Sequence, residues 1–142
     1  MPSIPSFGPT TNYARVSTLN YPTVTPTVDA TAAAITITPA QLLSGLLLRD
    51  ALSSARADLL PTAAALVAAI NGCQVNTSFR TIIRNTGAGA GSVTLTANTG
   101  ATISGTAAIV FQQQKELLIV ITNVTPGSEA YVAYSLGVSV AI

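Results

Sequence analysis

The sequence holds few of the side chains that carry out enzyme chemistry. It contains no histidine, so the commonest general base is absent, and its single cysteine, Cys73, excludes a disulfide within the chain. Lys115 beside Glu116 is one pair that could supply a base and an acid. A lysine next to a glutamate at a strand start is more typical of a solvated turn, and we expect that here.

Two aspartates are the other candidates for catalysis. Asp50 and Asp58 could act as the carboxylate pair of a glycoside hydrolase. Arg49 and Arg56 stand close to them in sequence, which favours a solvated loop with surface ion pairs. The five acidic residues of the chain also show no calcium-loop spacing. We therefore expect no enzyme activity, no cofactor and no metal.

A glycine-rich run and two arginines remain as candidate binding features. Gly87–Gly91 alternates glycine with alanine, but residues 92–96 read as a strand, so the helix N-terminus of a phosphate-binding loop is missing. We expect a hairpin loop there. Arg80 and Arg84 fall on one face of a predicted strand and could contact phosphate or an acidic protein patch, or simply face solvent.

The composition favours contacts with other proteins. Charged residues make up 8% of the chain, against about 25% in ordinary soluble domains, and the mean hydropathy is +0.53. A surface so poor in charge suits contact with neighbouring subunits better than free solution. The net charge of +1 gives no basic field for nucleic acid. No apolar run approaches the roughly 20 residues of a membrane span, and no secretory signal is present, so we expect folding in a cytoplasm.

Residues 1–30 are predicted to form an extended N-terminal arm. Five of the eight prolines lie in this segment, and proline favours extended backbone. Residues 12–21 contain no proline and could add a strand to the sheet edge of a neighbour. The alternative is a tail without a partner. If the arm binds a partner, its candidate contact residues are Phe7, Tyr13, Arg15, Leu19 and Tyr21.

Residues 31–142 are predicted to form one mainly β domain. Helices are expected from a Thr38/Gln41 capping box to Gly45, with Leu42 and Leu43 turned inward, and from Thr62 to Ile70. Alternating apolar residues predict six later strands, which together indicate an antiparallel β-sandwich or jelly roll with one or two short helices. The C-terminal residues Val138, Val140 and Ile142 either finish a strand or contact a partner. The expected strands are 34–37, 46–49, 77–85, 92–97, 101–104, 107–112, 116–124 and 130–136.

Several runs between Ile37 and Leu136 resemble a known family. They are Thr38–Asp50, Leu60–Leu66, Phe79–Asn85 and Val120–Thr125. These runs resemble the jelly-roll cement proteins that decorate the heads of tailed double-stranded DNA bacteriophages, most closely those of Bordetella phages. The resemblance implies a homodimer on the outer surface of an icosahedral head, bound to a major capsid protein of HK97-like fold. It implies no catalytic residues.

Together these features predict a structural virion protein. It would be a capsid cement or decoration protein that stabilises the shell by bridging neighbouring capsid subunits. The alternative is a receptor- or glycan-binding β-sandwich module on the virion, which would need an aromatic groove. Tyr131 and Tyr134 are the candidates for it, but their odd spacing places them on opposite faces of a strand.

Overall fold

The computed structural model describes residues 24–140, with side chains as far as Gly137. Residues 1–23, 141 and 142 lie outside this part, and with them the candidate contacts Phe7, Tyr13, Arg15, Leu19, Tyr21 and Ile142. The chain is mainly β-structure with two short helices, as predicted. In chain order the elements are β1 (Thr27–Asp29), α2 (Pro39–Leu43), β2 (Leu46–Arg49), β3 (Arg56–Leu59), α3 (Ala63–Ala69), β4 (Ser78–Asn85), β5 (Val93–Thr96), β6 (Ala101–Ser104), β7 (Ala108–Ile109), β8 (Gln113–Asn123) and β9 (Ala130–Val140).

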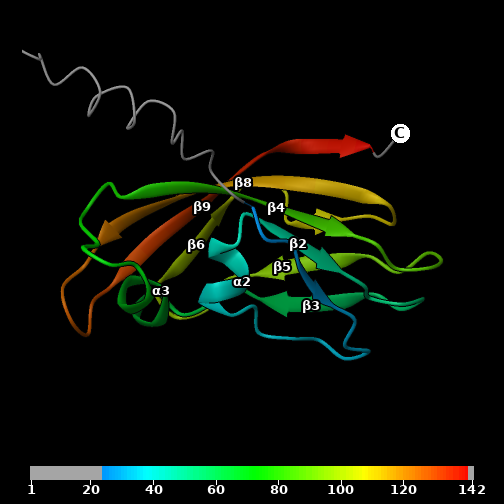
Figure 1. Cartoon of the computed structure of the whole chain (residues 1–142), viewed down its shortest axis with the longest axis horizontal. Coiled ribbons are helices and arrows are strands. Elements are labelled where there is room, and N and C mark those ends of the chain that lie inside the picture. The colour runs from blue at the N-terminus through cyan, green and yellow to red at the C-terminus, as the bar shows by residue number, and fades with distance from the viewer. Residues whose placement is uncertain (1–23, 141–142) are drawn as a thin grey trace, which may run out of the picture.

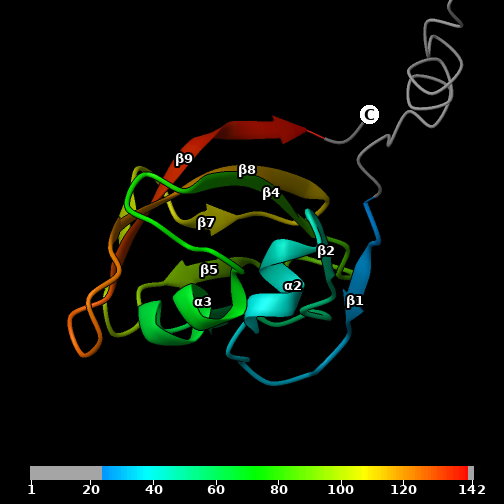
Figure 2. The same ribbon diagram turned by 60° about the vertical axis from the view of Figure 1, so that its left-hand side comes forward.

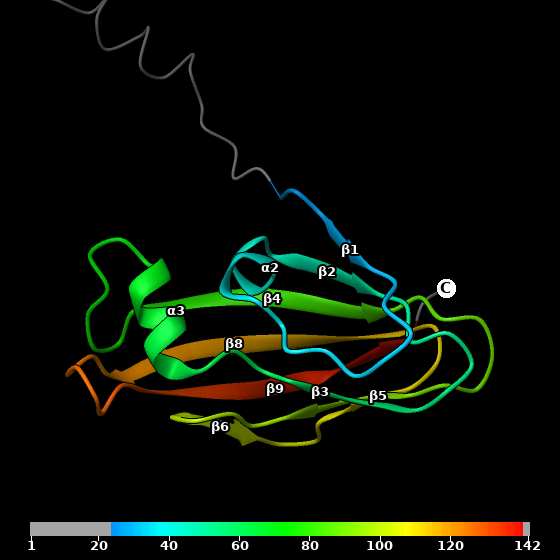
Figure 3. The same ribbon diagram turned by 90° about the horizontal axis from the view of Figure 1, so that it is seen from below.

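The strands form two sheets. The large sheet has the order β1-β2-β4-β8-β9-β6, and the small sheet has the order β3-β5-β7 (Figures 1 and 3). Antiparallel pairing is confirmed for β4 with β8, β8 with β9 and β5 with β7. The prediction of antiparallel pairing is wrong for four pairs, which run parallel: β1–β2, β2–β4, β3–β5 and β6–β9. Parallel neighbours need a crossover connection, which α2 provides between β1 and β2, and β3 with α3 between β2 and β4.

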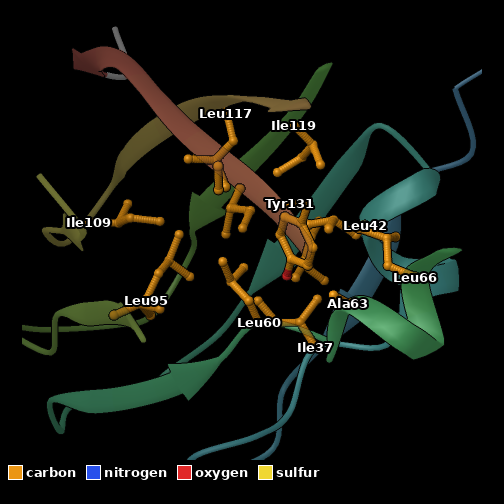
Figure 4. Packing of buried hydrophobic residues seen from close by; sticks show 14 of the residues in the cluster. Ile37, Leu42, Leu60, Ala63, Leu66, Leu95, Ile109, Leu117, Ile119 and Tyr131 are labelled. Atoms are coloured by element: carbon orange, nitrogen blue, oxygen red, sulfur yellow. The ribbon is translucent and has the colours of Figure 1, made fainter. Parts of the chain in front are cut away.

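The hydrophobic core lies between the large sheet on one side and the small sheet with both helices on the other (Figure 2). Strand β8 contributes Leu117, Ile119 and Ile121, all fully buried. Figure 4 shows Tyr131 in the middle of this packing, where its hydroxyl donates a hydrogen bond of 2.8 Å to the carbonyl of Pro61. Burial raises the pKa of this hydroxyl, so it remains a donor at neutral pH.

Both helices begin and end where the sequence indicated. The Thr38 hydroxyl accepts from the Gln41 amide, and the Gln41 side chain accepts from the Thr38 amide, completing the predicted capping box. Gly45 follows α2 with a φ of 84°, which costs little at glycine. Leu42 is buried as predicted, whereas Leu43 is exposed, because adjacent residues on so short a helix face different directions.

Two segments that precede α3 differ from expectation. Residues 34–37 make only an isolated bridge between Thr36 and Leu59 rather than a strand. Within the expected loop of residues 50–58 the chain instead enters β3 at Arg56, which pairs with β5. The local sequence pattern could not indicate β3, because this strand has few apolar residues. Its partner strand β5 lies 37 residues further along the chain.

The glycine-rich run is not a hairpin. It carries the chain from β4 in the large sheet to β5 in the small sheet, and it packs against the backbone of the loop that precedes β3. A Cβ built on Gly87 would lie 2.7 Å from the Leu52 carbonyl oxygen, and one on Gly91 would lie 2.7 Å from that of Ser54. Glycine is therefore required there for close backbone approach.

Strand β1 belongs to the large sheet, although it falls within the predicted arm. Thr27, Val28 and Asp29 pair in parallel with β2. The Asp29 carboxylate accepts hydrogen bonds of 3.0 Å from both the Thr31 amide and the Gln41 side chain. Burial alone would raise the pKa of this carboxyl, but the hydrogen bonds from Thr31 and Gln41 and the charge of Arg49 lower it below its ordinary value.

The Asp29 contacts should make β1 docking depend on pH. A carboxyl whose pKa is lower in the folded state contributes stability above its unfolded pKa, and that stability is lost as the pH falls through the folded pKa. We expect wild type to be more stable than Asp29→Asn at pH 7 and the difference to shrink below about pH 4. Urea unfolding of both proteins across this pH range measures the difference in their free energies of unfolding. A difference independent of pH would contradict the lowered pKa of Asp29.

Candidate functional site

The first candidate pair, Asp50 and Asp58, differs in burial and in hydrogen-bond partners. Asp58 is fully buried and forms an ion pair with Arg49, which is also fully buried, with Nε 2.7 Å from Oδ2. The other carboxylate oxygen of Asp58 accepts from the Ile35 amide at 3.0 Å and from Arg49 Nη2 at 3.3 Å. Asp50 instead accepts from the Leu52 amide. The expected solvated loop with surface ion pairs is therefore wrong for Arg49 and Asp58.

The remaining donors of Arg49 are also satisfied. Nη1 donates to the carbonyls of Thr31 at 2.7 Å and Asp50 at 2.8 Å, and Nη2 donates to that of Ala33 at 2.7 Å. A planar guanidinium with several fixed donors is well suited to such a site. The carboxylate of Asp58 is thus held in a buried network of hydrogen bonds, and we interpret the Arg49–Asp58 ion pair as structural.

The second candidate pair, Lys115 and Glu116, is separated by the alternation of β8. Lys115 points into the interior, is fully buried, and donates to the Thr106 carbonyl and, at 3.1 Å, to the Thr106 hydroxyl. Burial lowers the pKa of its ammonium group. Glu116 lies on the opposite face and pairs with Arg80 at 2.9 Å. The expected solvated turn is wrong, because both residues belong to a long strand.

The strongest candidate site is the side of the large sheet that faces away from the core, which we call the outer face. Strand alternation places one set of side chains there, while the helices and the small sheet lie on the other side (Figure 2). The exposed fraction differs between its residues: it is 70% for Val28, 46% for Leu136 and 40% for Tyr134. Its large apolar residues, read from strand register and burial, are Val28, Leu46, Leu48, Ile82, Leu118, Val120, Val132, Tyr134 and Leu136.

Polar side chains are interspersed in this apolar surface. Leu118 lies between Arg80 on β4 and Tyr134 on β9, and Arg84 lies between Leu48 and Gln114. The Arg80–Glu116 pair is exposed, with side chains 65% and 39% accessible. Arg84 Nε is buried and has no hydrogen-bond partner within residues 24–140.

The structure brings only some of the predicted contact residues together. Arg80 and Arg84 share the outer face as predicted, and Tyr131 and Tyr134 lie on opposite faces as predicted. Val138 and Val140 lie in β9, where they pair with β8, but their side chains are outside the described part.

Sequence reasoning missed the apolar residues of the outer face. A signal was present, because residues 117–121 and 46–48 are apolar at every position, whereas a strand with one solvated face alternates. Uninterrupted apolar runs are typical of strands covered on both faces. The outer face therefore has the composition of a surface that another element covers.

Enclosed sites are absent from the part of the chain that the structure describes. Within residues 24–140 no pocket is found, and no three acidic, histidine or cysteine side chains gather as metal ligands would. Among the same residues no helix has the length and apolar character needed to cross a membrane. The outer face is thus the candidate site that the described residues offer.

The buried Arg49–Asp58 pair should matter far more to stability than the exposed Arg80–Glu116 pair. We expect Asp58→Ala to reduce the free energy of unfolding by about 3–5 kcal/mol, because it leaves a buried guanidinium without its counter-charge. The matched control, Glu116→Ala, breaks an exposed pair and should cost about 0–1 kcal/mol. Urea unfolding measures both, and equal losses would contradict this ranking.

Lys115 should make the protein more stable at alkaline pH. Because its pKa is lower in the folded than in the unfolded state, the unfolded chain binds more protons between the two values and stability rises with pH there. We expect the stability of wild type relative to Lys115→Met to increase as the pH approaches about 10.4, the ordinary lysine value. Thermal unfolding of both proteins from pH 7 to 10 tests this prediction. A stability difference between them that does not change with pH would contradict it.

Comparison with known proteins adds no identification. No protein-family model, curated protein or solved structure matches this chain. The functional conclusion therefore depends on the outer face, the composition and the resemblance of the sequence runs described above.

Proposed function

We propose that this chain is a structural virion protein, a cement protein that binds the outer surface of a viral head. The observation that carries the proposal is the uncovered, largely apolar outer face. Five inter-strand spacings of about 4.8 Å make this surface about 24 Å wide across the six strands. An exposed surface with this many large apolar residues is typical of a protein-binding surface.

The composition of the outer face supports a protein partner. Tyrosine and arginine are enriched in interfaces, where they supply most of the binding energy, and the outer face presents Tyr134, Arg80 and Arg84. Arg80 is exposed and Arg84 is partly exposed, so both guanidinium side chains reach the surface of the outer face. Among residues 24–140 the exposed ion pair on this face is Arg80–Glu116, and with so few charges to screen, binding should tolerate high ionic strength.

The fold is consistent with such a module. We propose that the two sheets form a β-sandwich related to the jelly roll, which is supported by the shared core between them. The parallel pairs β1–β2 and β2–β4 depart from an all-antiparallel jelly roll. Two further parallel pairs, β3–β5 and β6–β9, depart from it in the small sheet and at the opposite edge of the large sheet.

The viral partner follows from the resemblance of the sequence runs. It makes the partner a major capsid protein of HK97-like fold, bound by homodimers at the seams between capsid subunits. Each contact can be modest, because many symmetric copies act together on one shell.

Substitutions on the outer face should weaken attachment to heads without unfolding the domain. We expect Tyr134→Glu and Leu136→Glu each to reduce binding by about tenfold or more, because each buries a charge in the interface. The matched control is Val75→Glu, since Val75 is 50% exposed but lies in the loop between α3 and β4. Co-sedimentation with heads stripped of the protein measures attachment, and thermal unfolding confirms the fold.

Two results would contradict the proposal. The first is equal attachment of the Tyr134→Glu, Leu136→Glu and Val75→Glu proteins. The second is absence of the protein from an image reconstruction of whole particles. Binding to glycans with no binding to heads would favour the receptor-binding alternative instead.

A further inference from the structure

Strand β9 is longer than its neighbour β6 and leaves an open edge. One edge of β9 pairs with β8 as far as Val140. The other edge pairs with β6 only from Tyr131 to Tyr134, where β6 ends at Ser104. Within residues 24–140, no strand lies beside this second edge from Ser135 to Val140. Six residues of backbone are therefore available for pairing on that side.

This open edge lacks the usual protection. Exposed sheet edges normally carry charges or proline, which block pairing with another chain. Residues 135–140 contain neither. A register shift opposite Gly137 is the one irregularity present. An unprotected edge of this length is a template for an added strand.

The chain itself contains a matching segment. Proline cannot donate to a strand ladder, so within the first 26 residues only the stretch between Pro9 and Pro22 can form a long paired strand. Residues 12–21 lie within it and are long enough to cover the six-residue edge. Alternation would place Tyr13, Leu19 and Tyr21 on one face of the strand, with Arg15.

Chain length decides which copy is paired. This segment enters the domain at β1, which is four strands away from β9 in the large sheet. A strand added beyond β9 would lie five spacings, about 24 Å, from β1. The six residues from Tyr21 to Thr27 span at most about 22 Å even when fully extended. Pairing of the whole stretch with β9 of its own chain would leave this linker fully extended, whereas a second copy imposes no such limit.

We propose that residues 12–21 of one copy add a strand to the open edge of β9, residues 135–140, in a second copy. The main-chain ladder provides affinity, and the proline-free length of the segment limits where pairing begins and ends. This exchange goes beyond the proposed function, because it needs no capsid and occurs between purified copies of the chain.

The test uses full-length variants. Thr18→Pro removes a ladder donor from the middle of the segment, while the matched control Ser6→Pro places proline in a part already rich in it. We expect wild type and Ser6→Pro to sediment as assemblies larger than a monomer, with slow hydrogen exchange at residues 135–140. Thr18→Pro should sediment as a monomer with fast exchange there and an unchanged melting temperature.

A monomeric wild-type chain would overturn the proposal. So would a Thr18→Pro protein that keeps both the wild-type mass and the slow exchange at residues 135–140. Attachment of Thr18→Pro to stripped heads distinguishes the two proposals, since weak attachment through the outer face should persist when strand exchange is lost.

Discussion

The buried contact between Arg49 and Asp58 is the constraint on which the arrangement of the two sheets depends. Arg49 ends β2 in the large sheet, and Asp58 lies in β3 of the small sheet, so their ion pair joins the two layers. The same guanidinium also binds the carbonyls of Thr31 and Ala33, which fixes the connection that crosses from β1 to α2. A buried charge pair is costly to desolvate and adds little net stability over an apolar pair. Its effect is to allow only the arrangement in which every one of its polar groups is satisfied.

The uncovered outer face follows from that arrangement. The helices and the small sheet all pack on one side of the large sheet, so its other side receives no cover from residues 24–140 (Figure 2). Its strands nonetheless carry Leu118, Val120 and Ile82 outward. With 8% charged residues in the whole chain, there are few side chains available to solvate this surface. The low charge and the apolar outer face are therefore two aspects of one property, a surface with few groups that bind water strongly.

Local features were predictable because their causes lie within a few residues. The capping box of Thr38 and Gln41 and the stop at Gly45 act inside one helical turn, and α2 has these limits. The strands β4, β5 and β6 were found from alternation, which indicates that one face is solvated or less buried. The placement of Arg80 and Arg84 on a common face of β4 was predictable for the same reason. Strand direction was not, because parallel pairing depends on which distant segments meet.

The sequence by itself therefore determined the mainly β character, the two capped helices, the alternation of the strands and the scarcity of charge. Only the tertiary structure decided that Arg49, Asp58 and Lys115 are buried, although charged residues near turns are usually solvated. Most of their partners are distant in sequence: Thr106 lies 9 residues from Lys115, and the carbonyls of residues 31 and 33 lie 18 and 16 residues from Arg49. Residue type sets the cost of burying a charge, but whether enough hydrogen bonds offset that cost is decided by long-range packing.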